Sequence, residues 1–277
     1  MYRVIKVLNN NGVLAYDMDG KEEVIFLGNG IGFGKKTGER FEDAGKANVY
    51  TAETRHSEDT ALQVVNGMDP LFLEITGRII DEAEKRFKNV SRDILLPLAD
   101  HIALAVQRAR EGREFLNPFN QDIRALFPEE YEVAQKGRKL IEQFAGQKIS
   151  EDEAGFITLH IHSALSDEDV EQSMTTARLV TESVAMIEEG MGIRIPVQSL
   201  GYNRLVSHIR YMLIRTLRGE RVNLDMEEYA RTSFPRAYAL AERICRYMEE
   251  ELKKPMLQQE VGFLGIHIER VAQMEQE

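Results

Sequence analysis

The spacing of hydrophobic and polar residues changes about a quarter of the way along the chain. Before that point, residues 2–8, YRVIKVL, alternate between the two classes and are rich in β-branched side chains, which favours a strand. A second alternating segment spans residues 12–28, and Asp19-Gly20 within it is a typical hairpin turn. Residues 48–53, NVYTAE, predict a last strand. The start of the chain is therefore predicted to form a small antiparallel β unit.

From Pro70 onwards, apolar residues recur at spacings of three and four, as in amphipathic helices. The predicted helices span residues 70–87, 96–112, 129–146, 150–165 and 176–191, with an irregular to helical segment at 113–128. Ser150 precedes one of these helices and Glu153 follows three residues later, a spacing that predicts a capping box. The polar stretch 53–69 is predicted to be a linker, in which His56 is exposed to solvent.

The helical part of the chain is a duplication. EAGFITLHIHSA, from Glu153 to Ala164, is repeated 107 residues later as EVGFLGIHIERV, from Glu260 to Val271. The same offset relates His101 to His208, His160 to His267, Phe127-Pro128 to Phe234-Pro235, and Tyr131 to Tyr238. A repeat of this length is a duplicated domain, because the units of solenoid proteins are shorter. We therefore expect a multidomain fold, with a small all-β domain followed by two homologous all-α helical bundles.

Composition restricts where such a protein works. The 277 residues are 43% hydrophobic and 29% charged, as in soluble globular chains, and the length suggests about two domains. No apolar run approaches the roughly 18 residues that span a bilayer, and the N-terminal apolar stretch is too short for a signal peptide. The single cysteine, Cys245, cannot form an internal disulfide and is expected to be a small core residue. We expect a cytoplasmic protein without membrane insertion.

The charge is distributed unevenly. The net charge of −11 argues against an obvious nucleic-acid binder. Residues 1–57, however, hold eight basic and eight acidic residues, so the whole excess of negative charge lies in the helical part. The β unit is therefore electrostatically distinct from the rest of the chain.

The glycine-rich segment 28–36, GNGIGFGKK, is the first candidate for binding chemistry. It matches neither G-x-G-x-x-G nor the G-K-[ST] ending of a phosphate loop, so a flexible β-turn is the structural alternative. Its glycines would leave the ring of Phe33 free of neighbouring side chains, and Lys35 and Lys36 follow. An exposed ring beside cations and bare amides suits stacking on an unpaired base. The three asparagines at 9–11 add amides that can bond base edges, which makes RNA the leading ligand.

The histidines are the second candidate. His160 and His162 are two residues apart on a predicted helix, so their side chains diverge and cannot chelate one metal ion together. Glu269 replaces His162 in the second copy, and we expect His162 to have a structural role at the surface. The four repeated histidines recur at two equivalent places in each copy. Because histidine can act as a nucleophile near neutral pH, they are candidate phosphoryl acceptors.

Together, LNNNG, GNGIGFGKK, DHIALAV and GFITLHIHSAL resemble the bacterial BglG/LicT/SacY family of transcriptional antiterminators, and the resemblance covers the whole chain. NPFNQDIRALFPEEYEVA and LHIHSALS look most like its glucose-type members. The resemblance implies a co-antiterminator RNA-binding domain at residues 1–57, a linker at 58–69, and two phosphotransferase-system regulation domains at 70–170 and 171–277. Family members bind as dimers to an imperfect hairpin in a leader transcript, which excludes an overlapping terminator.

The resemblance also implies site residues and partners. RNA contacts would fall on Lys6, Asn9, Asn10, Asn11, Gly28, Asn29, Gly30, Phe33, Lys35 and Lys36. Asn29 stands where the family commonly has a basic residue, which would weaken phosphate attraction or alter hairpin preference. The phosphorylated residues would be His101, His160, His208 and His267. The donors would be the phosphocarrier HPr and the sugar-specific transporter component, and neither a cofactor nor a catalytic residue is implied.

We considered two other functions. An enzyme could use the histidines for phosphoryl transfer or metal catalysis, but the sequence shows no convergent set of nucleophile, base and oxyanion donors. A DNA-binding repressor is a third reading, although the β-rich N-terminus lacks a helix-turn-helix pattern and β-ribbon readers are the remaining possibility. In the preferred reading, phosphates on the acidic bundles repel across a dimer and so weaken RNA binding.

Overall fold

The computed structural model describes all residues except 43, 52–60, 167, 198, 221–223 and 275–277. It divides into an N-terminal unit, Met1–Asn117 with Glu129–Val170, and a C-terminal unit, Pro118–Pro128 with Glu171–Glu277. His56 and the end of the last predicted strand lie outside the described residues. The β domain and most of the first repeat therefore form one compact unit.

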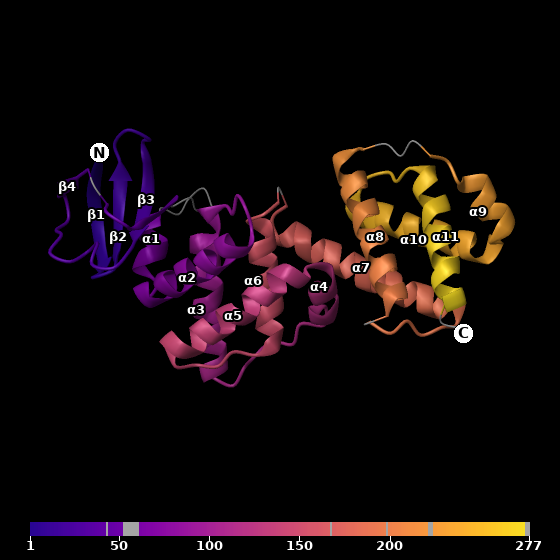
Figure 1. Cartoon of the computed structure of the whole chain (residues 1–277), viewed down its shortest axis with the longest axis horizontal. Coiled ribbons are helices and arrows are strands. Elements are labelled where there is room, and N and C mark those ends of the chain that lie inside the picture. The colour runs from indigo at the N-terminus through magenta and orange to yellow at the C-terminus, as the bar shows by residue number, and fades with distance from the viewer. Residues whose placement is uncertain (43, 52–60, 167, 198, 221–223, 275–277) are drawn as a thin grey trace. The chain divides into compact units, whose positions relative to one another are not determined.

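A five-stranded antiparallel sheet in the order β4-β1-β2-β3-β5 opens the N-terminal unit (Figure 1). The strands are β1 (Tyr2–Asn9), β2 (Gly12–Asp17), β3 (Glu22–Leu27), β4 (Arg40–Phe41) and β5 (Asn48–Thr51). The turn predicted from the three asparagines joins β1 to β2, which confirms it. The predicted Asp19-Gly20 turn lies in a longer loop, because Asp17 pairs with Glu22 and the left-handed residue is Lys21.

Six helical segments complete the described part of the N-terminal unit. They are α1 (Ala61–Asn66), α2 (Pro70–Arg86), the short 3-10 helix η1 (Arg92–Ile94), α3 (Leu95–Arg110), α5 (Pro128–Ala145) and α6 (Glu151–Ser163). Four of them follow the predicted helices closely. Helix α1 was missed, because the polar stretch predicted to be a linker hides two apolar residues at helical spacing. Val65 is buried, and Leu62 packs against the same core.

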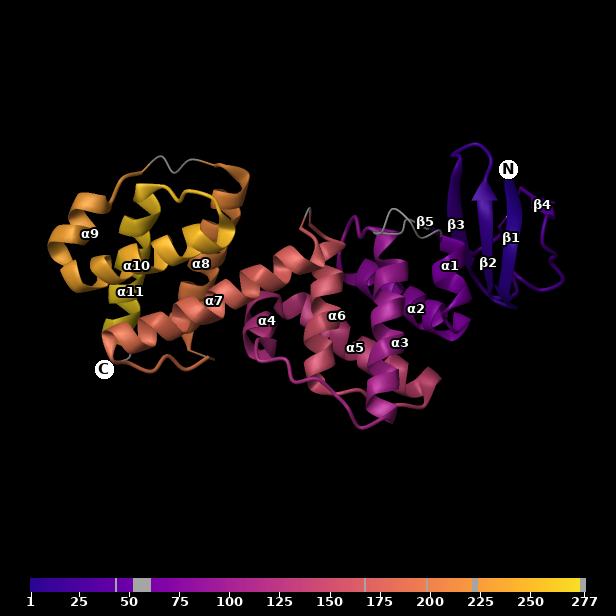
Figure 2. The same ribbon diagram turned by 180° about the vertical axis from the view of Figure 1, so that it is seen from behind.

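The sheet and the first bundle share one hydrophobic core. Leu14, Ile25 and Tyr50 from the sheet belong to the same buried cluster as the apolar faces of α2, α3, α5 and α6. Helices α1 and α2 lie beside the sheet in both views (Figures 1 and 2). Gly77 on α2 permits this approach, because a Cβ there would lie 3.0 Å from a methyl carbon of Leu27. The first bundle therefore covers apolar surface that the isolated β domain would expose.

The C-terminal unit repeats the order of the first. Its helices are α4 (Asn120–Leu126), α7 (Val170–Met191), α8 (Leu200–Arg218), α9 (Glu227–Ser233), α10 (Pro235–Leu252) and α11 (Gln258–Met274). Helices α9, α10 and α11 each begin 107 residues after α4, α5 and α6, which confirms the predicted duplication. No helix among the described residues is long and apolar enough to cross a membrane.

Buried polar contacts attach α4 to the rest of the C-terminal unit. The carboxylate of Asp122 accepts hydrogen bonds from the hydroxyls of Tyr202 on α8 and Thr181 on α7, the latter at 2.7 Å. Burial and the bond to Asp122 raise the pKa of the Tyr202 hydroxyl, so it stays a donor. These contacts explain why a segment of the first repeat belongs to the second compact unit.

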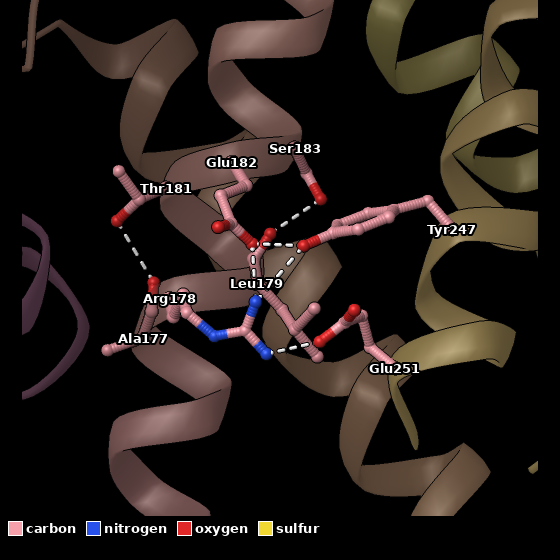
Figure 3. A network of polar contacts seen from close by, with 8 residues as sticks. All are labelled: Ala177, Arg178, Leu179, Thr181, Glu182, Ser183, Tyr247 and Glu251. Carbon is pink, nitrogen blue, oxygen red and sulfur yellow. Dashed lines mark hydrogen bonds and ion pairs between the residues drawn. The ribbon is translucent and has the colours of Figure 1, made fainter. Parts of the chain in front are cut away.

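A polar network joins α7 to α10 inside the C-terminal unit (Figure 3). Arg178 donates to Glu182 at 3.0 Å and to Glu251 at 2.5 Å, and the hydroxyl of Tyr247 donates to Glu182. Burial and the nearby carboxylate raise the pKa of Tyr247 to about 12. On the same α10, Cys245 is buried, as predicted for a core residue, and burial raises its pKa to about 12.

Candidate functional site

Nine of the ten predicted RNA-contact residues lie on, or at the ends of, two touching loops at one end of the sheet, and the tenth, Lys6, lies within β1. These loops are the turn between β1 and β2 and the glycine-rich segment after β3. The backbone N–H of Gly28 donates to the carbonyl of Asn11 at 2.9 Å, and that of Gly32 donates to Asn10 at 3.0 Å. A Cβ on Gly32 would lie 2.0 Å from the carbonyl oxygen of Asn9, so only glycine fits there. Backbone contacts therefore fix the two loops to each other.

One group of the predicted residues faces solvent. The side chain of Phe33 is 76% exposed, as its flanking glycines predicted. Asn10, Asn29, Gly30 and Lys36 are also exposed. Exposed aromatic, amide and cationic groups on one pair of loops can stack on a base, bond its edge and attract its phosphate. Whether they contact RNA stays a prediction.

A second group of the predicted residues contacts the protein itself. Lys6 Nζ donates to Asn66 Oδ1 on α1 at 2.7 Å. The side-chain amides of Asn9 and Asn11 both donate to the carboxylate of Glu74 on α2. Lys35 turns toward the sheet, where its Nζ lies 4.2 Å from the centre of the Phe41 ring. These four side chains connect the sheet to its surroundings, a role that the sequence did not reveal.

A cavity opens between the two loops and α2. Asn29 lines it together with the basic residues Lys46 and Arg78. Two basic side chains therefore lie close to Asn29. Arg78 lies over the Phe144 ring, with 4.5 Å between its guanidinium carbon and the ring centre.

The first histidine pair is built around a buried carboxylate. His101 on α3 and His160 on α6 face each other, with 5.4 Å between ring centres. Glu153 is only 1% exposed, and its carboxylate lies 3.1 Å from His101 Nε2 and 2.7 Å from Arg108 Nη2. Burial would raise the pKa of Glu153, but the contacts with His101 and Arg108 outweigh burial and lower it. A charged carboxylate therefore lies beside one histidine of this pair, without an aligned hydrogen bond between them.

In the second histidine pair, the equivalent residues make different contacts. His208 on α8 and His267 on α11 stack with their ring centres 3.9 Å apart. Glu260 is 1% exposed, and Arg215 bonds both of its oxygens, at 2.7 and 2.8 Å. Burial, then His267 and Arg215, lower the pKa of His208 to about 3, and burial also lowers that of His267. Both rings are therefore neutral at physiological pH.

Each repeat thus holds the same polar residues in one place. Besides the histidines, the duplicated set contains an arginine and a glutamate, at Arg108 and Glu153 and again at Arg215 and Glu260. Sequence reasoning missed both arginines, although the 107-residue offset relates them and could have identified them. The difference lies in the carboxylate. In the first repeat, one oxygen of the glutamate lies beside a histidine and the other beside an arginine. In the second repeat, the arginine bonds both oxygens.

Two predictions around the first pair need correction. Ser150 caps α6, accepting from the backbone N–H of Glu153 at 3.4 Å, but the Glu153 carboxylate turns into the bundle instead of closing a capping box. His162 is not at the surface: it is buried, with Nδ1 3.0 Å from a carboxylate oxygen of Glu130. In the part of the chain that the structure describes, no His, Cys, Asp and Glu residues cluster as metal ligands.

A small hollow adjoins the second pair. His267 lines it together with Arg204 and Arg270, two guanidinium groups that would attract an anion. The equivalent positions of the first repeat hold Pro97 and Ser163, neither of which is charged. The surroundings of the two histidine pairs therefore differ in charge as well as in hydrogen bonding.

Known families match both parts of the chain. The CAT RNA binding domain matches residues 2–58, and the PRD domain matches residues 77–164 and 181–271. A GlcT CAT-PRDI crystal structure is 35% identical, with a TM-score of 0.50, and the match covers 60% of this chain and 98% of that one.

Curated relatives match along nearly the full length. The PtsGHI operon antiterminator of Bacillus subtilis is 31% identical over 98% of this chain and 97% of its own length. The GlcA/glcB genes antiterminator of Staphylococcus carnosus is 28% identical over 98% and 96%. The transcription antiterminator LicT of Bacillus subtilis is 27% identical over 97% and 98%. With its matching CAT and PRD domains, this chain belongs to the family of PRD-containing transcriptional antiterminators.

Proposed function

We propose that this protein binds an imperfect hairpin in a leader transcript and thereby prevents formation of an overlapping terminator. The observation that carries the proposal is the exposed ring of Phe33 on loops that backbone hydrogen bonds fix to each other. Unlike a ring that only lies at the surface, this one is carried by a loop that backbone bonds hold in place beside exposed amides and a cation, which is what stacking on a base requires. The proposed RNA-binding domain is residues 1–57.

The neighbours of Phe33 suit the same ligand. Asn10 and Asn29 offer amides for base edges, and Lys36 offers a cation for a phosphate. Unpaired bases in internal loops of a hairpin are accessible to such a ring, whereas bases stacked in an A-form duplex are not. The operon names of the relatives point to a glucose or β-glucoside phosphotransferase operon as the target.

Binding of RNA hairpins with asymmetric internal loops by the full chain tests this proposal. Phe33→Ala should lower affinity by about 5- to 100-fold, the loss expected for one stacked base. Tyr16→Ala is the matched control, because Tyr16 is a 39% exposed aromatic residue at the other end of β2. Equal loss in both variants, or no loss in Phe33→Ala, would refute the assignment.

We further propose that the four repeated histidines accept phosphoryl groups. An unprotonated ring nitrogen would attack the phosphorus of the phosphohistidine on HPr, the donor's P–N bond would break, and the donor imidazole would take up a proton as it leaves. A phosphoryl group on the transporter component would be transferred in the same way, with cleavage of its bond to the donor side chain. In the second pair, burial lowers the pKa of His208 and keeps its ring neutral, as a nucleophile must be, and a donor can reach its buried Nε2 only if the helices around it move. Arg204 and Arg270 would then hold a phosphate on His267.

Regulation would follow from charge. We propose regulatory domains at residues 70–170 and 171–277, joined to the RNA-binding domain by residues 58–69, in a cytoplasmic homodimer. Each phosphate adds roughly −1.5 to −2 charges. Near a two-fold axis these charges would repel their copies and change the dimer on which RNA binding depends.

Phosphorylation of the full chain by purified HPr, with the modified residues mapped by mass spectrometry, tests this second proposal. His→Ala substitutions at positions 101, 160, 208 and 267 should each remove one site. Dimerisation by analytical ultracentrifugation and hairpin affinity are then compared with and without phosphate. Equal dimerisation and equal affinity would count against regulation by charge.

A further inference from the structure

Glu74 on α2 lies directly behind the two loops. One of its oxygens accepts a hydrogen bond from Asn9 Nδ2 at 2.6 Å, and the other accepts from Asn11 Nδ2 at 3.3 Å. A single carboxylate of the first regulatory bundle therefore bonds both asparagines that flank the exposed Asn10. Hydrogen bonds to a charged acceptor are stronger than those between neutral groups.

The side-chain oxygens of the same two asparagines accept hydrogen bonds from the backbone of the loops. Asn9 Oδ1 accepts from the backbone N–H of Asn11 at 2.8 Å, which shapes the turn between the strands. Asn11 Oδ1 accepts from the backbone N–H of Gly30 at 3.1 Å, which holds the glycine-rich loop against that turn. Each asparagine is thus oriented by Glu74 on one side and fixes a loop on the other.

Glu74 does not cover the exposed part of the loops. Phe33 and Asn10 stay open to solvent while the bonds to Glu74 are made. Glu74 lines the cavity beside the loops together with Asn11 and Asn29, but it leaves the exposed ring of Phe33 uncovered. Its contacts with the two amides are therefore those of a support.

We propose that Glu74 is a positioning residue through which the first regulatory bundle sets the geometry of the RNA-recognition loops. The inference rests on the proposed RNA binding and names the contact that connects it to the regulatory half. Helix α2 is suited to this role. It also bonds β5 through Asp81 and Asn48 at 2.9 Å, and it packs against α3, which carries His101. A shift of α2 would therefore reach the loops directly.

The direction in which hairpin affinity changes when Glu74 is replaced distinguishes a positioning role from competition with RNA. Removing a negative charge close to bound RNA would by itself strengthen binding, because phosphate repulsion falls. Loss of the support acts in the opposite direction, since loosened loops must be ordered again when RNA binds. If Glu74 instead competed with RNA for the two amides, its removal would also strengthen binding. Of these three effects, only loss of positioning lowers affinity.

The test uses Glu74→Ala and Glu74→Gln in the full chain. Hairpin affinity should fall about five- to tenfold in Glu74→Ala, and less in Glu74→Gln, whose amide oxygen can still accept one bond. Hydrogen exchange of the Gly30 amide should become faster in the same order, because Asn11 is less firmly oriented. Glu142→Gln is the charge-matched control: Glu142 is an exposed helical glutamate of α5.

Unchanged or higher hairpin affinity in Glu74→Ala would overturn the inference. So would unchanged exchange of the Gly30 amide, a measurement that needs no RNA. Failure of the unsubstituted chain to bind any hairpin would instead count against the proposed function, so the two failures are distinguishable.

Discussion

The buried ion pair between Arg215 and Glu260 yields the most quantitative prediction. Glu260 is 1% exposed, and Arg215 donates to both of its carboxylate oxygens. Arg215→Ala would leave a charged carboxylate inside the C-terminal unit without those two donors. Removing one partner of a buried pair is far more costly than removing both, because the remaining charge stays desolvated.

How much stability Arg215→Ala loses depends on how deeply the pair is buried. Breaking a fully buried pair costs about 3–5 kcal/mol. Arg215 keeps 26% of its side chain exposed, so water can partly replace it, and we expect the lower end, about 3 kcal/mol. For a unit of this size, that loss lowers the melting temperature by roughly 10 °C. The surface pair Arg218–Glu220, in which both side chains are more than half exposed, should contribute less than about 1 kcal/mol.

Urea unfolding of Arg215→Ala, Glu260→Gln and the double variant measures the coupling free energy between Arg215 and Glu260. The double variant should recover part of the stability that Arg215→Ala loses, because it leaves no buried charge. Arg218→Ala serves as the control for loss of a helical arginine. A cost for Arg215→Ala no larger than that of Arg218→Ala would show that the pair contributes no more than a surface contact, and strict additivity in the double variant would show that the two residues are not coupled.

Three further predictions concern the histidine sites and the loops. The folded-state pKa of His208 is lowered to about 3, so its contribution to stability is complete above the unfolded value near 6.5 and is lost as the pH falls toward 3. His208→Gln should flatten the pH dependence of urea unfolding over this range; an identical dependence would contradict the burial argument. Gly32→Ala should destabilise the sheet by about 2 kcal/mol and abolish hairpin binding, measured by thermal melting and RNA titration, because its Cβ would collide with the Asn9 carbonyl. Replacing Arg204 and Arg270 by Gln should shorten the lifetime of phosphate on His267 without affecting the first pair, as followed by phosphohistidine decay; equal lifetimes would exclude a phosphate-holding role for these arginines.

The elements of this fold were largely predictable from the chain itself. Alternation and the asparagine turn identified β1 and β2, and the 107-residue offset identified the repeat that α9, α10 and α11 complete. The exposure of Phe33 followed from its two glycine neighbours. Each of these features depends on local spacing, which the sequence carries directly.

The contacts that connect the elements were not predictable in the same way. Asn9 and Glu74 are 65 residues apart and follow no periodic pattern, so only the folded chain brings them together. Glu153 satisfied a local capping pattern, but a half-buried arginine on another helix bonds its carboxylate more strongly than a backbone N–H would. Tertiary packing likewise decided that Asp122 bonds residues of the second repeat.

We propose that the loops carrying Phe33 recognise an RNA hairpin and thereby prevent termination. In vitro transcription through a terminator overlapped by a hairpin that the protein binds measures this directly. Read-through should rise with the unsubstituted chain and with Tyr16→Ala, and stay at the protein-free level with Phe33→Ala. Equal read-through with Phe33→Ala and the unsubstituted chain would contradict the account.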